Sequence, residues 1–155
     1  MKRGISLIML VAIVVIISII ATAVAFSAEG VITKSKLNNF ATNMSKIEDA
    51  VTSYYVTRGA LPIINNSTVY TKAELLTLVG EEKSSALSTE ISSNGDNESE
   101  FYYVDVEKLN LENTVYDITL NSNSLVVNSE GTHVYYLDGY DINEELYFSV
   151  TKDME

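Results

Sequence analysis

The 155-residue sequence has no cysteine and no tryptophan, one proline and a single histidine. Without cysteine, neither a disulfide nor thiol chemistry can operate in this protein. A lone histidine leaves few ways to build a catalytic base or a zinc site, and no glycine-rich phosphate loop, G-x-S-x-G or H-E-x-x-H motif occurs. That histidine, His133, alternates with apolar residues and is expected to face solvent from a strand. We therefore expect a protein that is not an enzyme.

Basic residues are scarce as well. The sequence carries 10 lysines and arginines against 21 aspartates and glutamates, a formal net charge of −11, and every acidic residue follows Ala28. Phosphate backbones repel such a surface, so no direct nucleic-acid partner is expected. We expect the charge to keep an exposed surface soluble.

Charge is absent from a long stretch near the N-terminus. Residues 5–28 form an almost entirely apolar run, whose few hydroxyl side chains can bond to their own helix. The part from residue 5 to residue 26 would make a helix of about 33 Å, close to the roughly 30 Å apolar thickness of a bilayer. Lys2 and Arg3, the only charges before Glu29, favour a cytoplasmic N-terminus and a C-terminus outside. The run predicts a single span surrounded by membrane lipid.

Three interpretations of this segment are open. A removable secretory signal would be cut after the small-x-small site that ends at Ala25, but such signals usually have apolar regions of only about 7–15 residues. A permanent anchor would keep the whole segment. A pilin-type leader would lose only the first few residues and leave the helix attached.

The third interpretation rests on a resemblance. Lys2-Arg3-Gly4, followed directly by the apolar run, resembles the leader and transmembrane start of type IV pilins and type II secretion pseudopilins. The resemblance implies that a prepilin peptidase cuts after Gly4 and methylates the new terminus at Ile5. It implies a filament subunit whose partners are other pilin or pseudopilin subunits, the peptidase and the inner-membrane assembly machinery.

The assembly helix of such a subunit would include Ser6, Met9 and Ser18. At the fifth residue after the cut the family usually carries a glutamate, which pairs with the N-terminus of a neighbouring subunit in a low-dielectric bundle. Met9 stands at that position and cannot form the pair. Some family members at filament tips also lack the glutamate, because a tip subunit has no neighbour above it, so by this resemblance Met9 favours a minor subunit.

Beyond the span, the sequence predicts an α+β fold in the pilin order, with a long N-terminal helix packed on a C-terminal antiparallel sheet. Apolar residues recur every three or four positions from Leu37 to Tyr55, and Arg58-Gly59 should end this amphipathic helix. The expected division is a leader at 1–4, a transmembrane segment at 5–28 and an extracytoplasmic domain at 29–155, made of the amphipathic helix at 31–58, a connecting region at 59–100 and a β-sheet at 101–151.

The connecting region carries local helix signals. Thr71, with Glu74 three residues later, forms a capping-box pattern for a short helix at 72–79 that Gly80 should end. A second short helix is expected within 81–91, followed by a polar loop at 92–100.

The residues after Phe101 alternate in the manner of strands. Strands are expected at 101–106, 115–120, 124–127, 133–137 and 146–150, with a connecting turn at 108–111 and a hairpin turn at 129–131. Because the connections are short, the sheet should be an antiparallel meander that covers the amphipathic helix with one face. Neighbouring tyrosines at 102–103 and 135–136 should then point to opposite faces, one ring in the core and one on the surface.

Two acidic clusters are candidate calcium ligands, because calcium prefers roughly six to eight oxygen ligands. The first comprises Asp96, Asn97, Glu98 and Glu100, and the second comprises Asp138, Asp141, Asn143, Glu144 and Glu145. Neither has the regular calcium-loop spacing, and an ordinary solvated loop is the alternative. The second cluster, from Asp138 to Glu144 and Glu145, is the better candidate, and no other cofactor is expected.

Two functions from different classes remain open. The first is a structural subunit of a type IV pilus or secretion pseudopilus, resident in the membrane before assembly and in an extracellular filament, or fimbrium, afterwards. The second is a single-pass membrane-anchored extracellular domain that binds a ligand. Neighbouring genes for a prepilin peptidase and an assembly ATPase would favour the first.

Overall fold

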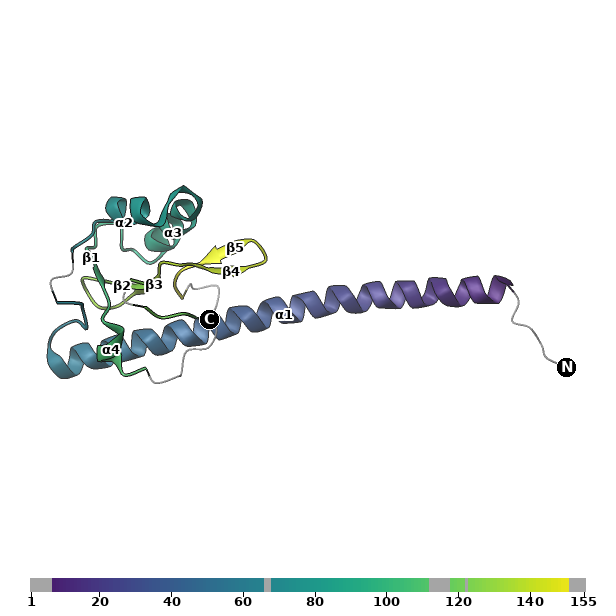
Figure 1. Ribbon diagram of the computed structural model, residues 1–155, viewed down its shortest axis with the longest axis horizontal. Helices are drawn as coiled ribbons and strands as arrows, with labels where there is room; N and C mark the ends of the chain where they lie inside the picture. The colour runs from purple at the N-terminus through teal and green to yellow at the C-terminus, as the bar shows by residue number, and fades with distance from the viewer. Residues whose placement is uncertain (1–6, 66–67, 112–117, 122, 151–155) are drawn as a thin grey trace. The chain divides into compact units, whose positions relative to one another are not determined.

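A computed structural model describes residues 7–65, 68–111, 118–121 and 123–150; within residues 7–29 it describes the helical backbone and, of the side chains, only Val15. The fold is α+β, with an N-terminal helix and small antiparallel sheets (Figure 1). The chain divides into two compact units, residues 1–35 and residues 36–155. All contacts described below lie within the second unit.

Helix α1, Leu7–Arg58, ends where the sequence predicted. The Gly59 amide donates to the Tyr55 carbonyl at 2.8 Å, and Gly59 has a φ of +68°, a conformation that glycine adopts without steric cost. Among the residues whose side chains the structure describes, no helix is long and apolar enough to cross a membrane. The predicted span at 5–28 lies outside those residues except for Val15.

Two short helices follow, α2 at Lys72–Val79 and α3 at Glu81–Ser93. Thr71 caps α2 as predicted: its hydroxyl accepts from the Glu74 amide, while the Glu74 carboxylate accepts from the Thr71 amide at 2.8 Å. Gly80, with a φ of +85°, allows the chain to turn directly from α2 into α3. Both predicted helices of the connecting region are confirmed.

The three-stranded sheet is a meander in the order β1-β2-β3, formed by Phe101–Tyr103, Leu125–Asn128 and Val134–Tyr136. Both pairings are antiparallel, and the β2–β3 hairpin turns through the predicted segment 129–131. The short helix α4, Val106–Leu109, takes the last residue of the strand predicted at 101–106 and overlaps the first half of the turn expected at 108–111. Half of the strand predicted at 115–120 lies outside the described residues, and the described half, 118–120, is not a strand.

The prediction of a single five-stranded sheet is wrong. Strands β4, Tyr140–Ile142, and β5, Glu145–Tyr147, pair only with each other and form a second sheet. Gly139, at φ +72°, turns the chain away from β3, and Asn143 and Glu144 both adopt positive φ in the hairpin turn. Two successive left-handed residues favour a tight hairpin, whereas the sequence predicted no strand between 137 and 146.

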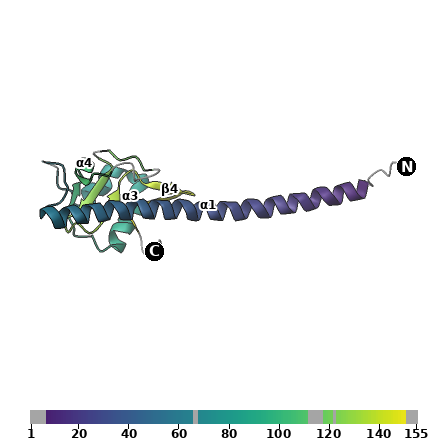
Figure 2. The same ribbon diagram turned by 90° about the horizontal axis from the view of Figure 1, so that it is seen from below.

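The three-stranded sheet is covered on both faces, not on one. Between α1 and the sheet lies a first cluster of fully buried side chains that includes Phe40, Met44, Ile47, Val51, Leu125, Val127 and Val134. Between the sheet and the α2–α3 pair lies a second cluster that includes Leu75, Leu87, Ile91, Phe101, Val126 and Tyr135. Figures 1 and 2 show the C-terminal turns of α1 beside the strands, with α2 and α3 on the opposite side in Figure 1.

This arrangement explains why the tyrosine prediction fails. Tyr135 and Tyr136 do point to opposite faces, but both faces are covered, so the two rings are 0% and 6% exposed. Tyr102 and Tyr103 are divided in the same way between the first and the second cluster, and both are partly buried.

Candidate functional site

The residues predicted for processing and assembly fall in the part of the chain that the structure describes least. Gly4, Ile5 and Ser6 lie outside the described residues. Met9 and Ser18 lie on α1, but their side chains are also outside them. Cleavage after Gly4 and assembly through this helix therefore stay predictions.

The most organised polar site in the described residues centres on Asp96, whose side chain is almost completely buried in the loop after α3. One carboxylate oxygen accepts from Asn128 Nδ2 at 2.9 Å and from the Ser99 hydroxyl at 3.2 Å. The other accepts from the Tyr135 hydroxyl at 2.6 Å and lies 2.9 Å from His133 Nδ1. One carboxylate thus fastens the loop to the β2–β3 hairpin, as the cost of burying it requires.

His133 is not the solvent-facing strand residue that we expected. It precedes β3, its side chain is 34% exposed, and its ring pairs with Asp96. Because the same Asp96 oxygen also accepts from Tyr135, we assign the ring proton to Nδ1 as the donor of this pair. The pair joins the residue before β3 to the loop after α3 and so helps to orient the hairpin.

The network continues from Tyr135 toward α3. Asn94 Nδ2 donates to both the Tyr135 and the Ser149 hydroxyls at 3.2 Å, and Ser149 donates to Glu90 at 2.7 Å. Burial, followed by the hydrogen bond to Asp96, raises the pKa of Tyr135, so its hydroxyl keeps its proton and donates. Burial also raises the pKa of Glu90. These residues join the loop, the strand and the C-terminal segment into one connected set of hydrogen bonds.

Glu48 is the only partly buried carboxylate that α1 directs at the sheet in the described residues. Its Oε1 accepts from the backbone amide of Val134, the first residue of β3, at 3.3 Å. Burial raises the pKa of Glu48 to about 7, against smaller opposing effects of the Val134 amide and of nearby His133, while neighbouring Asp49 raises it further. Helix and sheet therefore meet at a carboxyl group that titrates near neutrality.

The calcium candidates Asp138, Asp141, Asn143 and Glu144 lie around the β4–β5 hairpin and are exposed. Asp141 accepts from the Glu144 amide at 3.0 Å and so helps to hold the hairpin turn. Within residues 30–65, 68–111, 118–121 and 123–150, no group of three histidine, cysteine, aspartate or glutamate side chains is placed to hold a metal. The calcium hypothesis stays a prediction without support from the geometry.

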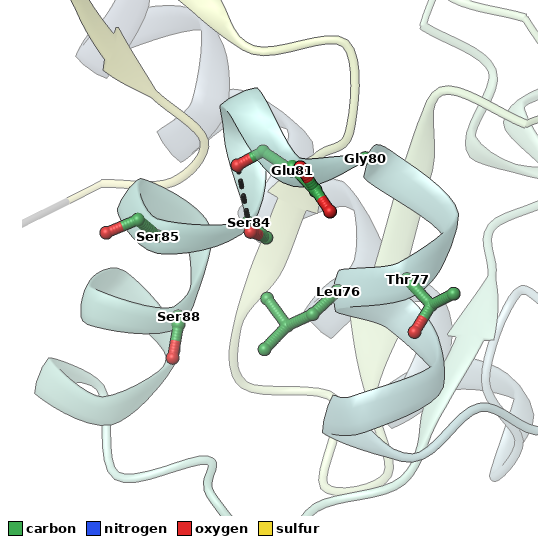
Figure 3. A pocket seen from close by; sticks show the side chains of 7 residues that line it. All are labelled: Leu76, Thr77, Gly80, Glu81, Ser84, Ser85 and Ser88. Carbon is green, nitrogen blue, oxygen red and sulfur yellow. Dashed lines mark hydrogen bonds between the residues drawn. The ribbon is translucent and has the colours of Figure 1, made fainter.

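An open hollow of about 660 Å³ lies between α2 and α3. It is lined by Leu76, Thr77, Gly80, Glu81, Ser84, Ser85 and Ser88. Figure 3 shows Ser84 bonded to the carbonyl of Glu81 one turn earlier, at 3.0 Å, while Ser85 and Ser88 project from the same helix. The lining hydroxyls and the Glu81 carboxylate could interact with a polar ligand, but the hollow is open and does not enclose one.

The polar residues that hold the Asp96 network and the helix–sheet contact could not be identified from the sequence. Asp96 was considered only as an exposed calcium ligand, and Glu48, Glu90 and Asn128 were not singled out. The contacts that join them to other elements span 32 to 86 residues along the chain, so no local pattern identifies them. The single histidine, His133, stands out in the sequence, but its pairing with Asp96 is visible only in the folded chain.

Comparison of the chain with protein-family models, with curated proteins and with solved structures finds no match. Its class must therefore be argued from its own residues and contacts.

Proposed function

We propose that the chain is a structural subunit of a type IV pilus or pseudopilus filament, processed after Gly4, and that Met9 marks it as a minor subunit. The observation that carries the proposal is α1, which is helical without a break from Leu7 to Arg58. The described backbone of the predicted span, from residue 7 onward, belongs to the same helix that carries Phe40 and Met44 of the first buried cluster. A domain that only needed tethering would more often follow its anchor with a flexible polar linker.

In such a subunit, the apolar helix moves from membrane lipid into a bundle of the same helices from other subunits. A helix that is apolar on all sides is stable in lipid and equally stable in a bundle of its own copies, so an assembly machine can move it between them at modest cost. The second unit of the chain has its own two buried clusters, whose described members all lie at or after Phe40. This division suits a protein whose helix changes environment while its domain stays folded.

The test is to follow the chain into filaments in the organism of origin. Filaments sheared from the cell surface should contain the wild-type chain, detected with an antibody raised against residues 36–155. Gly4→Leu should leave the precursor uncut in the membrane and remove the chain from the sheared fraction. Gly30→Ala is the matched control, because a Cβ at that helical position has no atom within 4 Å. Filaments that contain uncut Gly4→Leu chain would refute the proposal.

The anchored ligand-binding domain is the second candidate, favoured by the hydroxyl-lined hollow between α2 and α3. It predicts a chain that keeps Met1, stays in the membrane fraction and never enters the sheared material. The same experiment therefore separates the two functions.

A further inference from the structure

The loop that follows α3 contains the one Asn-Gly pair of the sequence, Asn94-Gly95. Asn94 is the C-cap of α3, and Gly95 follows it at a φ of +85°. An asparagine before glycine is chemically vulnerable, because glycine has no Cβ and its backbone nitrogen can therefore approach the asparagine side chain without a clash. This pair is the candidate site of a covalent change, the deamidation of Asn94.

Deamidation at this pair needs no reactant besides water. The Gly95 nitrogen attacks Cγ of Asn94, so that a new bond forms between these atoms and the bond from Cγ to Nδ2 breaks. The proton of the Gly95 nitrogen leaves with the side-chain nitrogen as ammonia. Water then opens the succinimide ring at one of its two carbonyl carbons, which gives aspartate or isoaspartate. In sum, an amide and water become a carboxyl group and ammonia.

Both reacting groups are engaged in other bonds in the folded domain. The Gly95 amide donates to the Ser92 carbonyl at 3.2 Å. Asn94 Nδ2 donates to the hydroxyls of Tyr135 and Ser149, each at 3.2 Å. The backbone between the two groups is held at the end of α3, because the Asn94 amide donates back into the helix. Ring closure requires these bonds to break, so its rate depends on the opening of this part of the domain.

The two hydroxyls require an amide nitrogen at this position. The Tyr135 hydroxyl donates its proton to Asp96 at 2.6 Å, and the Ser149 hydroxyl donates its proton to Glu90 at 2.7 Å. Each hydroxyl oxygen can then only accept a further bond, and the two hydrogens of Asn94 Nδ2 supply one donor to each. This count assigns Nδ2, and not Oδ1, to the side of the hydroxyls.

A carboxylate at position 94 reverses this pattern. Its oxygens would face two hydroxyl oxygens and would compete with Asp96 and Glu90 for the same two protons. A half-buried negative charge without donors is costly, and so is each buried group that loses its partner. Isoaspartate, in addition, lengthens the backbone by one carbon at the end of α3. The deamidated chain therefore loses the bonds that join the loop, β3 and the C-terminal segment.

We propose that Asn94-Gly95 is a deamidation site that the folded domain protects, and that its conversion in the unfolded chain prevents the polar network around Asp96 from forming again. A domain that stays unfolded long enough to react cannot regain its original stability. The inference does not depend on the filament proposal, because all of its residues belong to the second unit of the chain.

The first test measures the rate of the reaction in the full chain, purified in detergent and held at mildly alkaline pH with or without enough urea to unfold the domain. Mass spectrometry of the peptide that contains Asn94 follows the mass gained when an amide becomes a carboxyl group. The rate without urea should be at least about tenfold lower than in urea, because the reaction requires opening. Equal rates in the two conditions would overturn the proposal.

Gly95→Ala is the control for the chemistry of the site. In urea, where the native φ at this position imposes no constraint, the added Cβ should slow the reaction at Asn94. A Gly95→Ala chain that reacts as fast as the wild type in urea would show that the pair is not the reactive unit, and so would also overturn the proposal.

The second test measures the consequence of the reaction. Asn94→Asp imitates the aspartate product and should raise the ratio of unfolded to folded chain at least about tenfold in urea unfolding followed by circular dichroism, the effect of one buried polar group without a partner. Asn97→Asp is the matched control, because it adds the same charge to the same loop at an exposed position beside Lys72 Nζ, and it should not raise this ratio. Equal stability of Asn94→Asp and the wild type would refute the inference.

The wild-type chain gives the same readout if Asn94→Asp does not fold. Samples held in urea for increasing times are diluted into buffer, and the refolded fraction is compared with the fraction deamidated at Asn94. The refolded fraction should fall in step with the deamidated fraction. Deamidated chain that regains the full stability of the wild type would refute the inference.

Discussion

Replacing Glu48 by glutamine should make the domain more stable at alkaline pH. The side chain accepts the Val134 amide between α1 and β3, and burial raises its pKa from 4.5 to about 7. Glutamine has nearly the same shape and keeps an acceptor for that amide, but it carries no charge to desolvate. The substitution therefore removes the cost of the charge and keeps the contact.

The size and sign of this stability difference follow from the pKa of Glu48 in the unfolded chain, 4.5, and in the folded chain, about 7. Because the folded state holds this proton more tightly than the unfolded state, the stabilising contribution of Glu48 is fully present below pH 4.5 and is lost as the pH rises through 7. A rise from 4.5 to about 7 corresponds to about 3 kcal/mol, since each tenfold change in an equilibrium constant is worth about 1.4 kcal/mol. Most of the difference between the two chains should develop between pH 5 and pH 8.

Urea unfolding of a fragment of residues 30–155, followed by circular dichroism at pH 5 and pH 8, measures this directly. From pH 5 to pH 8, the free energy of unfolding of Glu48→Gln should rise by about 2–3 kcal/mol relative to that of the wild type. All other titrating groups are common to both chains, so their effects cancel in this difference. Asp49→Asn should gain much less, because Asp49 is the smallest of the effects that set the pKa of Glu48. A Glu48→Gln fragment that is less stable than the wild type at pH 8 would refute the reasoning.

Three further predictions test the architecture. Phe40→Asp should unfold the 30–155 fragment, because it removes a fully buried ring and inserts an unpaired charge at a cost of at least about 4 kcal/mol, whereas exposed Thr42→Asp should leave its circular dichroism unchanged. Thr71→Ala should lose the capping box of α2 and lower the free energy of unfolding in urea by about 1 kcal/mol. Removal of residues 1–29 should leave a soluble monomer in sedimentation that unfolds cooperatively. An insoluble fragment, or a Phe40→Asp variant as stable as Thr42→Asp, would contradict the packing of α1 on the sheet.

The elements that the sequence predicted well are those specified by neighbouring residues. The capping box at Thr71, the breakers Gly59 and Gly80, and the apolar spacing around Phe40 each act over a few residues. Local signals of this kind fix where a helix begins, where it ends and which side of it is buried.

What the sequence could not predict depends on contacts between distant segments. The apolar residues of α2 and α3 were visible, but nothing local says that they cover the far face of the sheet and so bury both Tyr135 and Tyr136. The hairpin that pairs β4 with β5 depends on a left-handed turn at Asn143 and Glu144, where glutamate is an uncommon choice.

The candidate site was the least predictable part for the same reason. A buried carboxylate is identified by its partners, and Asp96 finds them on a hairpin more than 30 residues away. From the sequence alone, an acidic residue in a polar loop is most simply interpreted as exposed, since unpaired carboxylates are seldom buried.

The most direct test of the filament account is the intact mass of the chain isolated from the membrane fraction of its own organism. The account predicts a mature chain that begins at Ile5, with the added mass of one methyl group on its amino terminus. A chain that begins at Met1 would contradict it in favour of a plain anchor. A chain that begins at Phe26 would contradict it in favour of a secreted protein.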